Sequence, residues 1–295
     1  MCGLVKTALL ALTLVLTLRA PAAALTTRDM LGRPVTLAAP ATRIVSLVPS
    51  VTEILFALGA EDRLVGVTDF CDYPPAARQK PSVGGMVSPN LEVLVSRKPD
   101  LVVATTEGTR EETVAQLERL RIPTYLVVAH RVTDVTALVS RLGELTGRRA
   151  AADALRARIE QRVDAVRRAV APYRRPRVLY VLWPEPLIVP GRGALVTELI
   201  RLAGGESISA GDGDSYPRYS LEAAVAKAPE VILLANHGAN TGPIDRERWQ
   251  RLSELPAIRT GRLHQVEGNL LHRYGPRVVD GLEQLARVIH PEAFR

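Results

Sequence analysis

Apolar residues recur at helical spacing along one uninterrupted stretch of the chain, residues 148 to 171, which lies between Gly147 and Pro172. The side chains that form this single stripe are Leu155, Ile159, Val163, Val166 and Val170. A helix of this length spans roughly 36 Å, about the diameter of a small domain. It is too long for a tight crossover, so we expect one rigid helix that connects two bodies.

The segments on either side of this helix resemble each other. The stretch NLEVLVSRKPDLVVA (90 to 104) is echoed by SLEAAVAKAPEVILLA (220 to 235), and VTEILFALGA (51 to 60) is echoed by VTELIRLAGG (196 to 205). Each half therefore contains a helix, a second helix that ends at a proline, and a buried strand. This order predicts an α/β fold of two similar lobes with parallel sheets and a ligand cleft between them, because ligands bind beyond the carboxyl ends of parallel strands.

The same patterns set the expected boundaries. The chain divides into a leader at 1–24, an N-terminal α/β lobe at 25–146, the connecting helix at 147–172 and a C-terminal α/β lobe at 173–295. Within the N-terminal lobe, a hairpin is expected at 26–38. Ser50 and Glu53 have the spacing of a capping box, in which each side chain satisfies a backbone donor at the start of a helix.

The leader has the features of a secretory signal peptide. Lys6 precedes an apolar run from Ala8 to Leu18, and a small-residue triplet ending at Ala24 supplies a cleavage signal. Cleavage there would start the mature protein near Leu25 and lower the formal charge from +7 to +5. Only Cys71 would remain, so no internal disulfide can form after cleavage.

Composition and motifs argue against several kinds of function. The charge is positive, but only 4% of the residues are aromatic and no basic and aromatic cluster accompanies it, so nucleic-acid binding is not expected. Gly191 and Gly193 begin like a dinucleotide loop, but Val196 stands where the third glycine belongs. The five histidines show no close ligand spacing, so we expect no resident metal site and no enzyme.

Four motifs, taken in order around the long helix, carry a resemblance to a known family. They are RIVSLVPSVTEILFALGA, VGVTDFCDYPP, NLEVLVSRKPDLVVA and SLEAAVAKAPEVILLA. The chain resembles the periplasmic solute-binding proteins that deliver vitamin B12, haem and ferric siderophores to ABC importers, and it is most similar to the vitamin B12 branch. The resemblance implies a soluble, monomeric periplasmic protein that captures cobalamin, or another metal chelate, and passes it to an inner-membrane permease with its ATPase.

The resemblance also implies a set of ligand-binding positions. These are Phe70, Met86, Thr105, Trp183, Tyr216, Asn269 and Arg273. Aromatic side chains would give a macrocycle flat surfaces, and Arg273 would reach amide or carboxylate groups at its rim. Met86 and Thr105 depart from the vitamin B12 pattern, where tryptophans are expected.

That departure keeps haem and ferric siderophores as alternative ligands. The candidates for ligating a haem iron are Met86, Tyr216, His237, His272 and Tyr274. For Trp183, ligand binding and ordinary packing are equally good interpretations, whereas Trp249 is assigned to packing. Tyr73 is expected to shape the turn in which it lies. Proteins of a different class, an exported α/β enzyme or a metallochaperone, are the remaining alternatives.

For the permease, the resemblance implies that Glu92 and Glu222 dock one lobe each onto arginines of the membrane protein. Their matching positions in the internal repeat suit a partner with twofold pseudosymmetry. The alternative is that both acids only favour the dipole of a helix that begins after Asn90 or Ser220. We favour docking, because a dipole effect alone does not require the same offset in both halves.

Overall fold

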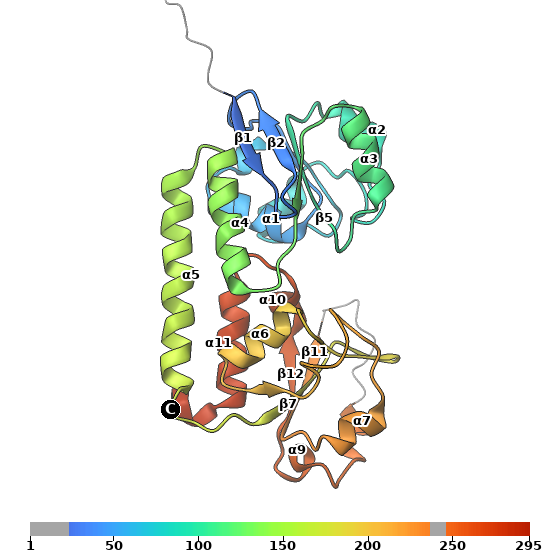
Figure 1. Ribbon diagram of the computed structural model, residues 1–295, viewed down its shortest axis with the longest axis vertical. Helices are drawn as coiled ribbons and strands as arrows, with labels where there is room; N and C mark the ends of the chain where they lie inside the picture. Colours follow the sequence, from blue (N-terminus) through green and yellow to red (C-terminus); the bar gives the residue numbers. More distant parts are fainter. Residues whose placement is uncertain (1–23, 237–245) are drawn as a thin grey trace, which may run out of the picture.

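The computed structural model describes residues 24–236 and 246–295. Its longest element is α5 (Arg149–Val170), which runs along one side of the molecule with one lobe at each of its ends (Figure 1). The predicted stripe is the packed face, since Leu155, Ile159, Val166 and Val170 are buried and Val163 is partly buried against the core. The predicted α/β architecture of two lobes joined by a single helix is therefore confirmed.

The N-terminal lobe is built on a parallel sheet with the order β4-β3-β5-β6. Its strands are β3 (Ile44–Ser46), β4 (Leu64–Val67), β5 (Leu101–Thr105) and β6 (Thr124–Val127). The expected hairpin is present as β1 (Leu25–Arg28) and β2 (Pro34–Leu37), paired antiparallel. The helices are α1 (Pro49–Ala57), α2 (Leu91–Ser96), α3 (Glu111–Arg119) and α4 (Val132–Leu145), with short 3-10 turns at Glu61–Arg63 and Pro75–Gln79.

The C-terminal lobe repeats this plan with the sheet order β10-β7-β11-β12. Its strands are β7 (Arg177–Val181), β10 (Glu206–Ser207), β11 (Val231–Asn236) and β12 (Leu263–Glu267), and a small hairpin joins β8 (Trp183–Pro184) to β9 (Leu187–Ile188). The helices are α6 (Leu195–Leu202), α7 (Leu221–Ala226), α8 (Arg246–Gln250), α9 (Pro256–Arg259), α10 (Gly268–His272) and α11 (Val278–Ile289), followed by a 3-10 turn at Pro291–Phe294.

The internal repeat extends to individual contacts. In both four-stranded sheets the first strand along the chain, β3 or β7, lies between the next two strands of its sheet, β4 and β5 or β10 and β11. Arg43, before β3, donates from Nε to the carbonyl oxygen of Lys98 (2.9 Å), and Arg177, in β7, donates from Nε to that of Ala228 (3.1 Å). Lys98 and Ala228 both have positive φ, 50° and 44°. The two lobes thus share topology and turn geometry.

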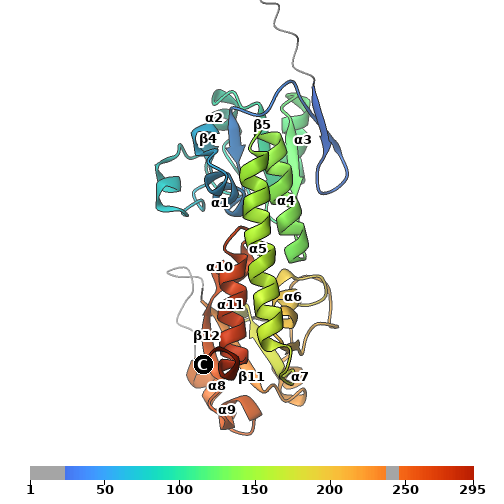
Figure 2. The same ribbon diagram turned by 90° about the vertical axis from the view of Figure 1, so that its left-hand side faces the viewer.

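A single hydrophobic core passes through both lobes by way of α5. It includes Ile44 and Tyr125 of the N-terminal lobe, Ile159 of α5, and Tyr180 and Leu282 of the C-terminal lobe. Helix α5 packs against α4 in one lobe and against α11 in the other (Figure 2). The relative position of the lobes therefore depends on side-chain packing as well as on the continuity of one helix.

Helices α4 and α5 approach closely where a glycine permits it. A Cβ atom at Gly143 would lie 2.4 Å from the Cβ of Ala152, which is closer than two carbon atoms pack.

Among the described residues, none of the helices is both long and apolar enough to cross a membrane. The predicted signal peptide lies outside the described residues, apart from Ala24.

Candidate functional site

The carboxyl ends of the two sheets face each other between the lobes. Thr105 is the last residue of β5, and Tyr274 follows α10, which begins directly after β12. The hydroxyl of Tyr274 donates a hydrogen bond to that of Thr105 at 2.7 Å, and both residues are buried. This contact joins the two strand ends across the lobes, at the edge where parallel sheets bind ligands.

The residues that the resemblance implied as ligand contacts differ in exposure. Phe70, in the loop after β4, is 51% exposed, and Trp183, at the start of β8, is 37% exposed, with its indole nitrogen bonded to the carbonyl oxygen of Glu185. Thr105 is 2% exposed and already bonded to Tyr274. Met86 is half-buried, and a Cβ at Gly108 would lie 2.7 Å from its methyl carbon. Phe70 and Trp183 are therefore the aromatic faces that remain open.

A histidine and two tyrosines form a hydrogen-bonded group beside this contact. Nε2 of His272 lies 2.8 Å from the hydroxyl of Tyr180, and Nδ1 lies 3.4 Å from the hydroxyl of Tyr216. Burial raises the pKa of both phenols, so they stay protonated at neutral pH. Asn269, on α10 with His272, is half-buried and donates from its backbone to the side chain of Glu267. The group contains Tyr216 and His272, two of the alternative candidates for ligating a haem iron. Another candidate, His237, lies outside the described residues.

Arg273 has protein partners on the opposite lobe. Its Nη1 lies 2.5 Å from Oδ1 of Asp72 and 3.6 Å from Oε1 of Glu53. Burial alone would raise the pKa of Asp72, but the hydrogen bond and charge of Arg273 outweigh it, and the pKa lies below its usual value. Both ion pairs involve Nη1, so the role that the resemblance implied for Arg273 would fall to the other nitrogens of its guanidinium.

Glu53 forms a bidentate ionic contact between the lobes. Arg277, before α11, donates to its two carboxylate oxygens at 2.6 and 2.9 Å, in the bidentate arrangement that suits a guanidinium. The guanidinium also lies over the ring of Tyr73, 3.6 Å from its centroid, in the turn that Tyr73 was expected to shape. The side chain of Glu53 is 2% exposed.

The capping box expected at Ser50 and Glu53 was wrong. Helix α1 begins after Val48, whose side chain makes no capping hydrogen bond. Pro49 is the first residue of the helix, and proline has no backbone N–H that would need a partner there. Ser50 Oγ has no hydrogen-bond partner among the described residues. The carboxylate of Glu53 instead binds a guanidinium that lies 224 residues further along the chain.

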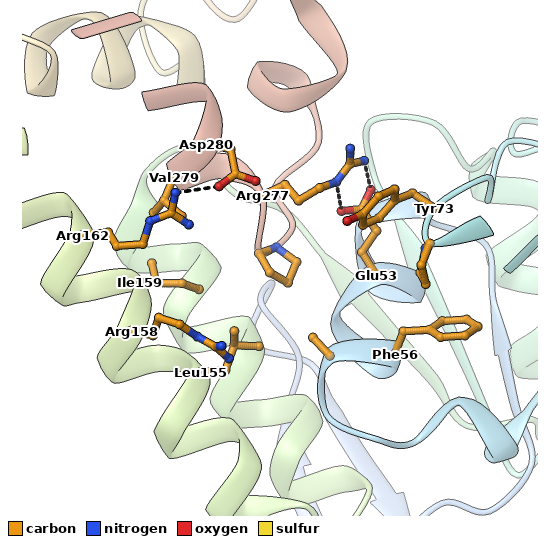
Figure 3. A pocket seen from close by; sticks show the side chains of 13 residues that line it. Glu53, Phe56, Tyr73, Leu155, Arg158, Ile159, Arg162, Arg277, Val279 and Asp280 are labelled. Carbon is orange, nitrogen blue, oxygen red and sulfur yellow. Dashed lines mark hydrogen bonds and ion pairs between the residues drawn. The ribbon is translucent and has the colours of Figure 1, made fainter. Parts of the chain in front are cut away.

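A cavity of about 410 Å³ lies on the α5 side of this ionic contact, between α1, α5 and α11. Figure 3 shows Glu53, Arg277 and Tyr73 on one wall, and Ile159 with the ion pair between Arg162 and Asp280 on the other. Of the described residues that line it, none is among the seven implied ligand positions. We therefore assign this cavity to the space behind the lobe contact. The candidate cleft remains a prediction at the carboxyl ends of the sheet strands, where Phe70 follows β4 and Trp183 follows β7.

The two predicted docking acids occupy equivalent, exposed places. Glu92 and Glu222 are both the second residue of a short helix, α2 or α7. The backbone donors of these helices are capped by other residues, because Asn90 accepts from Val93 at 3.1 Å and Ser220 accepts from Ala223 at 3.0 Å. Both helices lie on the side of the molecule away from α5 (Figure 1). The arrangement leaves both carboxylates available to a partner on that side.

Among the described residues, no group of three or more histidine, cysteine, aspartate or glutamate side chains is arranged to hold a metal ion. The lone Cys71 is buried, and burial raises the pKa of its thiol despite hydrogen bonds to the hydroxyls of Thr52 and Thr68.

Trp249 is buried in a hydrophobic cluster of the C-terminal lobe that also includes Leu179 and Leu234, which confirms its assignment to packing.

The sequence did not identify Glu53, Asp72 and Arg277 as residues that join the lobes. No local pattern identifies them, since their partners lie in the other lobe.

Comparison with known proteins places these features among transport proteins. The family model described as "Periplasmic binding protein" matches residues 44–268. The vitamin B12-binding protein of Vibrio cholerae is 31% identical over 264 residues, which cover 88% of this chain and 91% of that protein. An uncharacterized ABC transporter substrate-binding lipoprotein of Bacillus subtilis is 29% identical, covering 90% of this chain and 86% of that protein. The structure of the periplasmic haem-binding protein BhuT with two haems superposes with a TM-score of 0.76 at 29% identity, covering 85% of this chain and 98% of that one.

Proposed function

Because this chain belongs to the periplasmic binding protein family, we propose that it captures a corrinoid, cobalamin first, between its lobes and delivers it to an ABC permease. The observation that carries the ligand assignment is the similarity to a vitamin B12-binding protein over nearly the full length of both chains. Phe70 and Trp183 support it, since each offers an open aromatic face at the candidate cleft.

The lobe contact supports recognition by a preformed cleft. The ion pairs of Glu53 with Arg277 and of Asp72 with Arg273 bridge the lobes, and α5 packs into both. A chelate would then enter a gap whose width is set before binding, and little closure would follow.

Haem is the second candidate ligand, and one observation favours it. Tyr216 and His272 lie together beside the candidate cleft, and a tyrosine or a histidine can ligate a haem iron. The similarity to a haem-binding protein at 29% identity agrees with this alternative. A ferric siderophore is the third chelate to test.

A spectroscopic titration distinguishes these ligands. The purified protein is titrated with cyanocobalamin, haemin and a ferric siderophore, and we expect saturable binding of cyanocobalamin. Trp183→Ala should weaken that binding, whereas Tyr173→Ala, with the same 37% exposure, should not. Preferential binding of haemin would transfer the assignment to haem. Tight binding of a bare divalent ion without any chelate would favour the metallochaperone, and turnover of a chelate would favour an enzyme.

Export to the periplasm follows from the proposed leader. When the gene is expressed with its own leader in a Gram-negative host, the periplasmic protein should be a monomer that begins near Leu25. An intact Met1 on cytoplasmic protein would contradict this proposal.

Docking through Glu92 and Glu222 is the remaining part of the proposal. Replacing both by alanine should leave ligand affinity unchanged and weaken assembly with the permease. Two exposed acids that face two basic sites speed the association and fix the orientation of the complex. Glu111→Ala combined with Glu254→Ala is the matched control, since those acids are also exposed. Equal assembly of the docking variant and the control would refute the role.

A further inference from the structure

Helices α2 and α7 expose an apolar side chain next to each glutamate. Val95 and Val225 stand three residues after Glu92 and Glu222, and each is 37% exposed. Residues three apart lie on one face of a helix, so each acid has a valine as its neighbour. Burial over the six residues of α2 matches that of α7 position by position. The repeat has therefore duplicated an acidic and apolar pair.

The N-terminal lobe adds an apolar hollow to this pair. A depression of about 440 Å³ between α2 and α3 is lined by Leu91, Glu92, Val95, Gln116, Arg119 and Leu120. Leu120 is 53% exposed, more than any other large apolar side chain in the described part of the chain. Exposed apolar groups gathered around a concavity mark surfaces that bind a partner.

The chemistry and the duplication together indicate the occupant. A partner that meets both lobes must present the same pair of groups twice, a basic group for the carboxylate and an apolar group for the valine. A permease with twofold pseudosymmetry has this property, and α2 and α7 both lie away from α5, on one side of the molecule (Figure 1).

We propose that Val95, Leu120 and Val225 form the apolar part of the permease-docking surface, and that the hollow on the N-terminal lobe receives an apolar side chain of the permease. This inference rests on the proposed function. The N-terminal lobe then makes the larger contact, because Leu120 and the hollow belong to it. Glu92 and Arg119 also line the hollow, so an acidic and a basic residue accompany its apolar lining.

Salt separates the ionic part of such a surface from the apolar part. Ions screen contacts between exposed charges, so removing an acid lowers both the affinity and its dependence on salt. Burial of apolar surface is not screened in this way. A variant that loses only the apolar part should therefore bind more weakly at every salt concentration with an unchanged slope.

The experiment measures binding to the purified permease and ATPase complex whose ATPase activity the wild-type protein stimulates, held in lipid nanodiscs. The variants are Leu120→Ser, Val95→Ser and Val225→Ser, with Leu31→Ser as the control, because Leu31 is 49% exposed and lies in the β1–β2 turn. We expect Leu120→Ser to raise the Kd about tenfold with an unchanged salt slope. The two valine variants should each raise it several-fold, and the control should match wild type.

Binding of all three variants within twofold of wild type would overturn the inference. If Glu92→Ala with Glu222→Ala still weakened assembly in the same assay, the proposed function would stand and only the apolar part would be wrong. If the wild-type protein stimulated no permease, docking itself would be wrong. Unfolding temperatures equal to that of wild type show that each variant is folded.

Discussion

Glu53→Gln tests the contact that fixes the two lobes relative to each other. The substitution keeps the shape of the side chain and removes the charge that Arg277 and Arg273 share. Residues 273 to 277 are also close to α1, since a Cβ at Gly275 would lie 3.2 Å from Oε2 of Glu53. The effect of the substitution therefore reports on the contact between lobes.

The expected magnitude follows from burial. The side chain of Glu53 is 2% exposed, whereas that of Arg277 is 22% exposed and can be partly hydrated after the substitution. Hydrogen bonds to charged groups contribute about 1.5–3 kcal/mol, and breaking a fully buried pair costs about 3–5 kcal/mol. We expect Glu53→Gln to lower the free energy of unfolding by about 2–3 kcal/mol, near the first range, because Arg277 keeps access to water.

The assay is a double-mutant cycle of Glu53→Gln and Arg277→Met, followed by urea unfolding at neutral pH. A coupling energy of about 1.5 kcal/mol or more would match the two short hydrogen bonds. Glu254→Gln is the control, because Glu254 is exposed. A coupling below about 0.5 kcal/mol, the usual value for exposed ion pairs, would refute the reasoning.

Three further predictions concern the frame around the site. Gly143→Ala should destabilise the protein by about 1–3 kcal/mol in thermal unfolding, because overpacking against Ala152 exceeds the gain in helix propensity, and an unchanged or raised Tm would contradict it. Tyr274→Phe removes the hydrogen bond to Thr105 and should cost about 1 kcal/mol in urea unfolding; equal stability would show that the bond contributes nothing. Arg174 lowers the pKa of Glu230 from 4.5 to about 2, so the ionised carboxylate stabilises the fold above pH 4.5 and loses this effect as the pH falls towards 2. Glu230→Gln should therefore be less stable than wild type at pH 7, with a difference that shrinks below pH 4.5, and a constant difference would be evidence against that pKa.

The main elements of the fold could be predicted because their signals are local. The helix expected at 148 to 171 is α5 at Arg149–Val170, since an apolar stripe and its flanking Gly147 and Pro172 all lie within one segment. The buried strand expected in each half is β5 or β11, which ends one residue beyond the repeated stretch that closes at residue 104 or 235. The internal repeat predicted the common topology of the two sheets.

The contacts between the lobes could not be predicted from local signals. Ser50 and Glu53 match a capping box, but the carboxylate gains more from a bidentate guanidinium than from one backbone donor. No local pattern around Arg273 indicates that it pairs with two carboxylates of the other lobe. Such pairings depend on where packing places segments some 200 residues apart.

In the proposed function, α5 and the ion pairs hold the two lobes at a fixed separation, so that a broad chelate enters a gap that already exists. The direct test is a pulsed electron-spin distance between labels at positions 111 and 254, one in each lobe, in a Cys71→Ser background. It is measured without ligand and at saturation with the chelate that the titration selects. We predict one narrow distance that changes by less than about 2 Å on binding. A broad distribution without ligand, or a larger shift on binding, would contradict the account.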